Sequence, residues 1–243
     1  MDTYTLLTGA TSGIGLDLAI RLSGERNLIL VGRNEAKLDE TIRQMDGPHK
    51  ILKLVCDLDY GRREVATLLS DLIKKNDLQI EALVHCAGIS KVMPLRQADT
   101  DSIDSIFNVN ILSAMELIRP LLKKENKGGL KNIVLISSLA SIRGEKGNTV
   151  YAASKGALNA LAISLAKELA PNVRVNSVSP GTVETPMTQT FLESEAGEAH
   201  LQTYPLGVGH CDDITNLVSF LLSDETRWIT GQNIVIDGGR STY

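Results

Sequence analysis

The chain has 243 residues, of which 43% are hydrophobic and 22% are charged, as is typical of a soluble globular protein. This length fits one large α/β domain better than two small ones and allows a substantial buried core. The formal net charge of −4 offers no general attraction to nucleic acid or to an anionic membrane, so neither is an expected partner.

Two further features favour a cytoplasmic protein. Cys56, Cys86 and Cys211 are an odd, scattered set without metal-ligand spacing, so we expect reduced thiols and no metal site. The first expected strand starts at Thr3, which leaves no room for a signal peptide, and no apolar run reaches the roughly 20 residues that span a bilayer.

Short, β-branched apolar segments alternate with amphipathic stretches of helical length along the whole chain. In chain order, the expected strands are Tyr4–Leu7, Leu28–Val31, Ile51–Val55, Ala82–His85, Asn132–Ser137, Arg174–Ser179 and Asn233–Ile236. The expected helices between them are Ile14–Ser23, Glu35–Met45, Arg62–Lys75, Ser102–Lys124, Tyr151–Leu169 and Asp212–Ser223. Several strands are apolar on consecutive residues, which is typical of strands covered by helices on both faces. The pattern predicts a doubly wound α/β fold with a parallel, seven-stranded sheet and right-handed crossovers.

No repeat, low-complexity segment or linker divides the chain, so residues 1–243 are expected to form a single domain. The one long irregular stretch is Thr185–His210, rich in Gly, Thr and Glu. A loop of that length in a compact domain is usually a lid or a binding segment, and we expect a substrate lid at about residues 185–210.

A glycine-rich turn, Thr8-Gly9-Ala10-Thr11-Ser12-Gly13-Ile14-Gly15, joins the first strand to the first helix. Gly9 permits the tight turn, Gly13 lets the backbone approach a pyrophosphate, and Gly15 lets the helix pack closely on the strand. The helix N-terminus offers unpaired N–H groups and a positive dipole end to phosphates. Such turns also occur for packing reasons alone, so this motif requires support from the rest of the chain.

The end of the second strand favours NADP(H) over NAD(H). An acidic residue there would bind the adenosine ribose and repel a 2′-phosphate, but the sequence has Gly32 followed by Arg33. An arginine can pair bidentately with a phosphate, although a solvated surface arginine is the alternative. Asp57, after the third strand, is placed to accept from the adenine amino group or to cap its own turn. The small Ala87-Gly88 pair allows backbone to pass over the ribose.

A tyrosine and a lysine share one face of the helix expected over Tyr151–Leu169. Tyr151 and Lys155 are four residues apart, so the phenol and the ammonium lie one turn apart, and we expect the cation to lower the pKa of the phenol. Such a phenol can exchange a proton with an alkoxide as hydride moves. Ser138 ends the fifth strand, where its hydroxyl can polarise a carbonyl oxygen. Asn110 either holds a water against Lys155 or bends its helix.

Over essentially the whole chain, these motifs resemble the short-chain dehydrogenase/reductase family, which has a Rossmann-type fold. The resemblance rests on the glycine turn, Asp57, Ala87-Gly88, Asn110, Ser138, Tyr151/Lys155 and Pro180-Gly181 with Thr185. It implies that Tyr151 is the acid/base, that Lys155 lowers its pKa and binds the nicotinamide ribose, that Ser138 contacts the carbonyl and that Asn110 joins a proton relay. Together with Arg33, the motifs assign the cofactor contacts to Gly9, Thr11, Ser12, Gly13, Ile14, Gly15, Arg33, Asp57, Leu58, Ala87, Gly88, Tyr151, Lys155, Pro180, Gly181, Val183 and Thr185.

One motif departs from the family pattern. The usual Asn-Asn-Ala-Gly is His85-Cys86-Ala87-Gly88 here, so an asparagine that steadies the central sheet is missing. We expect His85 to supply a replacement hydrogen bond and Cys86 to be a small buried hydrophobe.

The C-terminal third looks like that of 3-oxoacyl-carrier-protein reductases, through Pro205-Leu206-Gly207 and the ending Ile236-Asp237-Gly238-Gly239. Many sugar, polyol and small-ketone reductases share that tail. A carrier protein also requires a basic patch, and the two positions where arginines are expected read Lys127-Gly128-Gly129 and Ala170-Pro171-Asn172. The lysines that could compensate are Lys123, Lys124, Lys127 and Lys131. The substrate is therefore an acyl thioester or another small molecule.

The family resemblance also implies a homotetramer or homodimer. The interfaces would involve the helices Ser102–Lys124 and Tyr151–Leu169 and the C-terminal strand, although a buried core helix would have a similar sequence. A non-catalytic NADP(H) sensor is the alternative of another class, but such proteins typically lose the tyrosine or the lysine.

Overall fold

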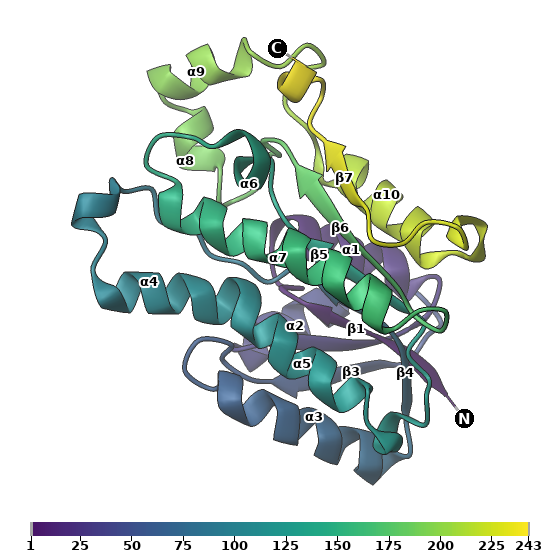
Figure 1. Cartoon of the computed structure of the whole chain (residues 1–243). Coiled ribbons are helices and arrows are strands. Elements are labelled where there is room, and N and C mark those ends of the chain that lie inside the picture. Colours follow the sequence, from purple (N-terminus) through teal and green to yellow (C-terminus); the bar gives the residue numbers. More distant parts are fainter. Residues whose placement is uncertain (1, 243) are drawn as a thin grey trace.

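The computed structural model describes residues 2–242 and contains the predicted α/β architecture, with seven strands in one sheet (Figure 1). The strands are β1 (Thr3–Thr8), β2 (Asn27–Gly32), β3 (Ile51–Val55), β4 (Gln79–His85), β5 (Asn132–Ile136), β6 (Arg174–Pro180) and β7 (Asn233–Ile236). Their order in the sheet is β3-β2-β1-β4-β5-β6-β7, and each neighbouring pair is parallel.

Helices cover both faces of this sheet, because consecutive strand residues point to opposite sides and are apolar on both. Leu6 belongs to one core and Leu7 to the other. The first core is covered by α3 (Arg62–Asn76), α5 (Ser113–Leu121) and α7 (Thr149–Glu168). The second is covered by α1 (Gly13–Ser23), α2 (Glu35–Arg43) and α10 (Cys211–Leu222).

The helix predicted over Ser102–Lys124 is interrupted. The structure has α4 (Thr100–Phe107), a π turn over Asn108–Leu112, and then α5, which runs on from the turn in Figure 1. The N–H of Ser113 donates to the carbonyl of Asn108, five residues back instead of four. π turns of this kind occur often at functional sites, and this one carries Asn110.

The prediction that Thr185–His210 is irregular is wrong. Two short helices form there, α8 (Gln189–Leu192) and α9 (Glu195–Leu201), and another short helix, α6 (Ala140–Arg143), follows β5. The side chain of Ser194 caps α9 by accepting from the N–H of Gly197, as a good N-cap residue does. Figure 1 shows α6, α8, α9 and the C-terminus together at one end of the molecule.

The topology places a ligand crevice between the carboxyl ends of β1 and β4. The chain leaves these neighbouring strands toward opposite faces of the sheet, and ligands of open α/β sheets bind at such a switch point. Lys127 and Lys131, by contrast, precede β5 and therefore lie at the amino ends of the strands, away from this crevice. Across residues 2–242, no helix is both long enough and apolar enough to cross a membrane.

Candidate active site

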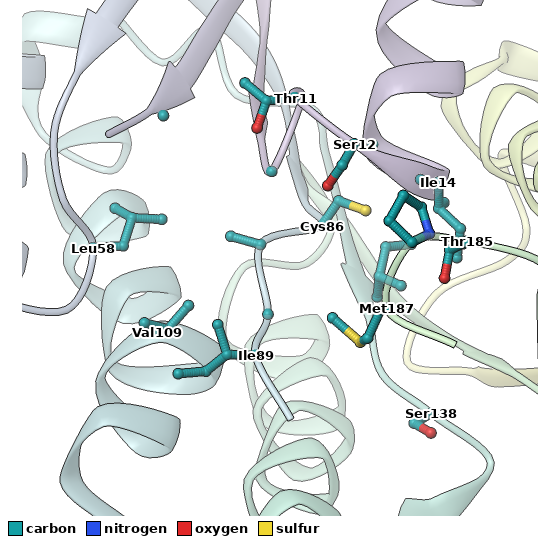
Figure 2. Close-up of a pocket in the computed structure, with 18 of the residues that line it drawn as sticks. Thr11, Ser12, Ile14, Leu58, Cys86, Ile89, Val109, Ser138, Thr185 and Met187 are labelled. Atoms are coloured by element: carbon teal, nitrogen blue, oxygen red, sulfur yellow. The ribbon is translucent and has the colours of Figure 1, made fainter. Parts of the chain in front are cut away.

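A cavity of about 400 Å³ opens at this switch point (Figure 2). In Figure 2, Leu58, Ile89 and Val109 lie along one side, and Ser12 and Ile14 along the other. The structure brings together at this cavity the residues that the sequence assigned to the cofactor and three of the four assigned to catalysis. These are Gly9, Thr11, Ser12, Gly13, Ile14, Gly15, Arg33, Asp57, Leu58, Ala87, Gly88, Ser138, Tyr151, Lys155, Pro180, Gly181, Val183 and Thr185.

The glycine turn is packed so closely that side chains are excluded. Gly9 has a φ of +73°, and a Cβ there would lie 2.8 Å from the backbone nitrogen of Ala87. A Cβ on Gly15 would lie 2.1 Å from the carbonyl oxygen of Gly9. The turn therefore lets α1 begin directly over the end of β1, with its N-terminus toward the cavity.

Thr8 fastens the turn to the neighbouring strand. Its Oγ1 accepts hydrogen bonds from the N–H groups of Cys86 and Ala87, at 3.1 and 3.0 Å, and lies 3.1 Å from Nδ1 of His85. The replacement hydrogen bond expected from His85 is thus present.

The catalytic candidates lie where β5 ends and α7 begins. Tyr151 is in the first turn of α7, and Lys155 follows one turn later, as predicted. The ammonium of Lys155 donates to the carbonyl of Ile136 at 2.7 Å and lies 5.8 Å from the centre of the Tyr151 ring. Ser138 hydrogen-bonds to the phenol and thereby favours its ionised form.

Burial governs the ionisation of these groups. It raises the pKa of Tyr151, and the hydrogen bond from Ser138 opposes this only in part. Burial also lowers the pKa of Lys155 to about 8. The expected net lowering of the Tyr151 pKa is wrong, because desolvation outweighs the influences that favour the phenolate and the ammonium of Lys155 is directed to the carbonyl of Ile136.

Asn110 lies beside the cavity rather than in its lining. Its carboxamide accepts from the N–H of Ile89 at 2.8 Å, and it donates to the carbonyl of Ile89 and to the hydroxyl of Ser154. The residue also lies in the π turn, so the expected distortion of its helix is present. Its part in a proton relay stays a prediction.

The cavity lining after β2 and β3, where we expect the adenosine, includes Arg33 and Asp57. One carboxylate oxygen of Asp57 accepts from the N–H of Asp59 at 2.9 Å, which is the Asx-type turn considered as the alternative. Two carboxylates that follow Arg33 in the sequence, those of Glu35 and Asp39, bind the ammonium of Lys53, at 2.9 and 2.6 Å. Among the described residues, Arg33 itself forms no ion pair.

The sequence did not single out several apolar lining residues. Ile89 and Val109 lie on the side of the cavity formed by the chain after β4 and by the π turn, and Met187 projects from the segment before α8 (Figure 2). Met187 falls within the predicted lid, and Ile89 directly follows Gly88. Only this closeness in sequence to predicted site segments could have identified them as lining residues. Cys86, expected as a small buried hydrophobe, is only partly buried and lines the cavity.

Known proteins with similar sequences include reductases and dehydrogenases. A family model described as "Enoyl-(Acyl carrier protein) reductase" matches residues 9–241. A 3-oxoacyl-[acyl-carrier-protein] reductase of Thermotoga maritima is 34% identical over 241 residues, which cover 96% of this chain and 96% of that protein. A cyclopentanol dehydrogenase of a Comamonas species is 32% identical over 246 residues, covering 98% of this chain and 96% of that protein.

Solved structures are similar over the same length. The structure of 4-hydroxyisoleucine dehydrogenase complexed with NADH has a TM-score of 0.90 at 28% identity and covers all of both chains. A short-chain type dehydrogenase/reductase from Mycobacterium ulcerans also has a TM-score of 0.90, at 29% identity, covering 99% of this chain and 90% of that one. The chain therefore belongs to the short-chain dehydrogenase/reductase family, whose members are oxidoreductases that bind a nicotinamide cofactor.

Proposed function

We propose that this protein uses NADPH to reduce a carbonyl group to an alcohol. The observation that carries the proposal is the convergence of Ser138, Tyr151 and Lys155 on the same cavity as the glycine turn. A dinucleotide held by the turn would present its nicotinamide toward these three side chains, since the cavity joins them without interruption.

The cavity suits a dinucleotide on structural grounds. The glycines of the turn line the cavity without side chains, because a Cβ at Gly9 or Gly15 would clash with neighbouring backbone, and α1 begins in this turn, so its N–H groups and positive dipole end lie at the cavity. Bound NADPH would supply the hydride. Residues of the turn would hold the pyrophosphate, and Val183 and Thr185 would contact the carboxamide.

Arg33 supports NADP(H) as the cofactor. Because Lys53 engages the carboxylates of Glu35 and Asp39, these groups compete less for the Arg33 guanidinium. That guanidinium can then bind a 2′-phosphate bidentately.

The three side chains divide the remaining chemistry. The Ser138 hydroxyl donates to the substrate oxygen and polarises the carbonyl. Tyr151 is protonated at neutral pH, because a phenol ordinarily has a pKa near 10 and burial raises it further, so it can give its proton to the oxygen as the carbonyl carbon accepts hydride. The charge of Lys155 stabilises the phenolate that remains, which then regains a proton from solvent.

Two substrate classes fit this mechanism, an acyl thioester and a small ketone. The lysines that would replace a carrier-protein patch lie before β5, and Lys127 pairs with Asp77 at 2.5 Å. β5 has five residues, so its two ends are separated by roughly 15 Å. This distance from the cavity favours the small ketone, whereas the T. maritima relative favours the thioester.

The first experiment compares NADPH and NADH oxidation against an acetoacetyl thioester, a diketone, a keto sugar and a cyclic ketone. We expect turnover with NADPH, and loss of turnover in Tyr151→Phe with cofactor affinity retained, since the ring stays and only the proton donor is removed. An active Tyr151→Phe protein would contradict the mechanism. Cofactor binding without turnover on any substrate, in the unsubstituted protein, would favour a sensor instead.

Arg33→Ala tests the choice of cofactor. We expect the dissociation constant for NADPH to rise roughly 10-fold or more while that for NADH stays nearly constant, because a charged hydrogen bond contributes about 1.5–3 kcal/mol. Arg43→Ala on the exposed side of α2 is the matched control. Equal losses for the two cofactors would remove Arg33 as the phosphate ligand.

A further inference from the structure

The segment that carries Ser138 is joined to the catalytic helix by two side chains that the proposed mechanism does not use. Asn159 lies on α7, two turns after Tyr151 and one turn after Lys155, so these three residues share one face of the helix. Ser141 lies in the short helix α6, three residues after Ser138. The Nδ2 group of Asn159 donates to the hydroxyl oxygen of Ser141 at 2.9 Å. This hydrogen bond joins α6 to the helix that holds the phenol and the ammonium.

The hydrogen bonds of Ser141 fix the direction of its hydroxyl. It donates to the carbonyl of Ser138 at 2.6 Å, closer than its two other side-chain partners. Its single proton is used there, so its oxygen accepts from Asn159 instead of donating to it. The Ser137 hydroxyl, which donates to the backbone carbonyl of Lys155 at 2.8 Å, lies 3.3 Å from the same oxygen. One hydroxyl thus connects the chain that leaves β5 with α7.

The amide of Asn159 is oriented by this arrangement, and its other end has no partner. Because Nδ2 faces Ser141, Oδ1 faces elsewhere, and there it is buried and accepts no hydrogen bond within the described residues. A buried amide oxygen without a donor opposes folding. The contribution of Asn159 is therefore the direction that it gives to the Ser141 hydroxyl, rather than a full set of hydrogen bonds of its own.

The pair formed by Ser141 and Asn159, here called the clamp, acts on the residue expected to polarise the substrate. The Ser138 carbonyl is held by Ser141, and the Ser138 hydroxyl oxygen accepts from the N–H of Ala140 at 3.2 Å. The hydroxyl proton of Ser138 is left for another acceptor. In the proposed reduction, Ser138 and Tyr151 contact the same substrate oxygen, so the separation of their two hydroxyl groups matters. They belong to different segments, and the clamp bridges these.

We propose that Asn159 and Ser141 are positioning residues that hold the Ser138 hydroxyl against the phenol of Tyr151 for carbonyl reduction. The catalytic part of this inference rests on the proposed function. The geometric part, that the clamp holds α6 on α7, rests on the hydrogen bonds alone. Neither Asn159 nor Ser141 is among the residues that line the cavity, so both act through Ser138 and not on the substrate.

A double-mutant cycle tests the catalytic part. Asn159→Leu breaks the clamp, and we expect kcat to fall by about 10- to 100-fold, as for an ångström-scale misplacement, with the dissociation constant for NADPH unchanged. In a protein that already carries Ser138→Ala, the same substitution should cost less than about 2-fold, because the hydroxyl that the clamp positions is gone. An equal loss with and without Ser138 would mean that Asn159 supports the fold in general, and would overturn the positioning role.

Isosteric and conservative variants separate hydrogen bonding from packing. Asn159→Asp keeps the shape but replaces the donor with an acceptor, so at pH 8 the Ser141 hydroxyl would turn to the carboxylate and release Ser138. We expect a loss of kcat as large as in Asn159→Leu. Ser141→Thr keeps the hydroxyl and should retain most of the activity that Ser141→Ala loses. Full activity in Asn159→Asp or in Ser141→Ala would contradict the proposal.

The matched control is Ser70→Ala on α3. Ser70 is partly buried, as Ser141 is, and its hydroxyl donates to the carbonyl of Ala66 at 2.9 Å. This substitution should leave kcat unchanged. If Ser138→Ala retains no measurable rate, or if Asn159→Leu does not fold, the comparison of Ser141→Thr, Ser141→Ala and Ser70→Ala decides the catalytic part, since equal rates in all three would overturn it.

Hydrogen exchange tests the geometric part without any turnover. The N–H of Ser141 donates to the same Ser138 carbonyl at 3.0 Å, so release of this carbonyl should loosen the first turn of α6. We expect peptides covering residues 138–144 to exchange roughly 5-fold faster in Asn159→Asp than in the unsubstituted protein, as for the loss of one hydrogen bond. Unchanged exchange would overturn the clamp. If the unsubstituted protein reduces no carbonyl compound, the proposed function fails while exchange still decides the geometry.

Discussion

Tyr151 and Lys155 are both buried, and burial moves their pKa values in directions that matter for the chemistry. The phenol of Tyr151 is protonated at neutral pH even at its ordinary pKa, and burial raises that pKa further, which favours the form that carbonyl reduction requires. The pKa of Lys155, lowered to about 8, still leaves this side chain mostly charged there. The four-residue spacing placed the pair correctly, but a sequence carries no measure of desolvation, so the direction of the Tyr151 shift was not predictable.

His85 makes the stability of the fold sensitive to acid. Its pKa is about 3 in the folded chain, against a usual value of 6.5, so between these values the unfolded chain binds the proton that the folded chain lacks. The contribution is complete above pH 6.5 and is lost as the pH falls toward 3. At about 1.4 kcal/mol per pKa unit, it amounts to at most roughly 5 kcal/mol.

Urea unfolding at several pH values measures this effect. We expect the unfolding free energy of the natural sequence to fall between pH 6.5 and 4 more steeply than that of His85→Asn, which has no ring to protonate. His49→Asn, at a site that is only partly buried, is the control and should keep the steep dependence. Parallel curves for the natural sequence and His85→Asn would exclude His85 as the source.

At the scale of elements, the sequence predicted long elements well and their irregularities poorly. The apolar periodicity of residues 102–124 predicted a helix, but a π turn adds a single residue to one turn and leaves that periodicity almost intact. α8 and α9 have four and seven residues, too few for a periodic pattern to emerge. The location of residues 185–210 was predictable even though their helices were not. The chain that follows β6 leaves the carboxyl end of that strand, and the cavity lies at the same edge of the sheet.

One residue that holds the predicted lid against the rest of the chain is Tyr204, and a substitution there can test its contribution. The Tyr204 hydroxyl accepts from the N–H of Thr182 and donates to its Oγ1, at 2.9 and 2.8 Å, and the ring lies beneath the guanidinium of Arg240. Tyr204→Phe keeps the ring and removes these two hydrogen bonds, which contribute about 1 kcal/mol each, and the longer contact of the hydroxyl with Nε2 of His200 at 3.4 Å. We therefore expect faster hydrogen exchange, by roughly 10-fold or more, in peptides covering residues 185–204.

Hydrogen exchange followed by mass spectrometry makes this measurement, and KM for the carbonyl substrate should rise in parallel if the segment covers the substrate. Tyr60→Phe is the matched control, because Tyr60 is 89% exposed and far along the chain from the lid. Exchange that is equally slow in the natural sequence and Tyr204→Phe would show that other contacts hold the segment.

At the scale of the whole molecule, the sheet topology could be predicted from the alternation of strands and helices along the sequence. Seven apolar segments separated by helices predicted a parallel sheet, and the right-handed crossover rule limits how such a sheet can wind. The register of neighbouring strands and the packing of the two cores could not be predicted, because both depend on contacts between residues that are far apart in the sequence. The site was predictable because the topology brings the ends of β1, β4, β5 and β6 to one edge, so motifs far apart in sequence meet there.

The predicted homotetramer or homodimer can be tested on surfaces that the single chain leaves apolar. Met115 on α5 and Ile163 on α7 are 44% and 48% exposed, and both helices cover the same face of the sheet (Figure 1). Burying such a face between two copies would remove apolar surface from water at about 25 cal/mol per Å². A charge placed there would have to be desolvated, so Ile163→Glu should dissociate this interface.

Light scattering after size-exclusion chromatography gives the mass directly, and we expect four copies of the 26.3 kDa chain. Ile163→Glu should yield a smaller species with an unchanged circular dichroism spectrum. Ile20→Glu is the control: Ile20 lies on α1, on the opposite face of the sheet, and is 37% exposed. A monomeric natural protein, or equal dissociation by both substitutions, would mean that this face serves no assembly. Retained activity in an Ile163→Glu monomer would further show that each chain holds a complete site.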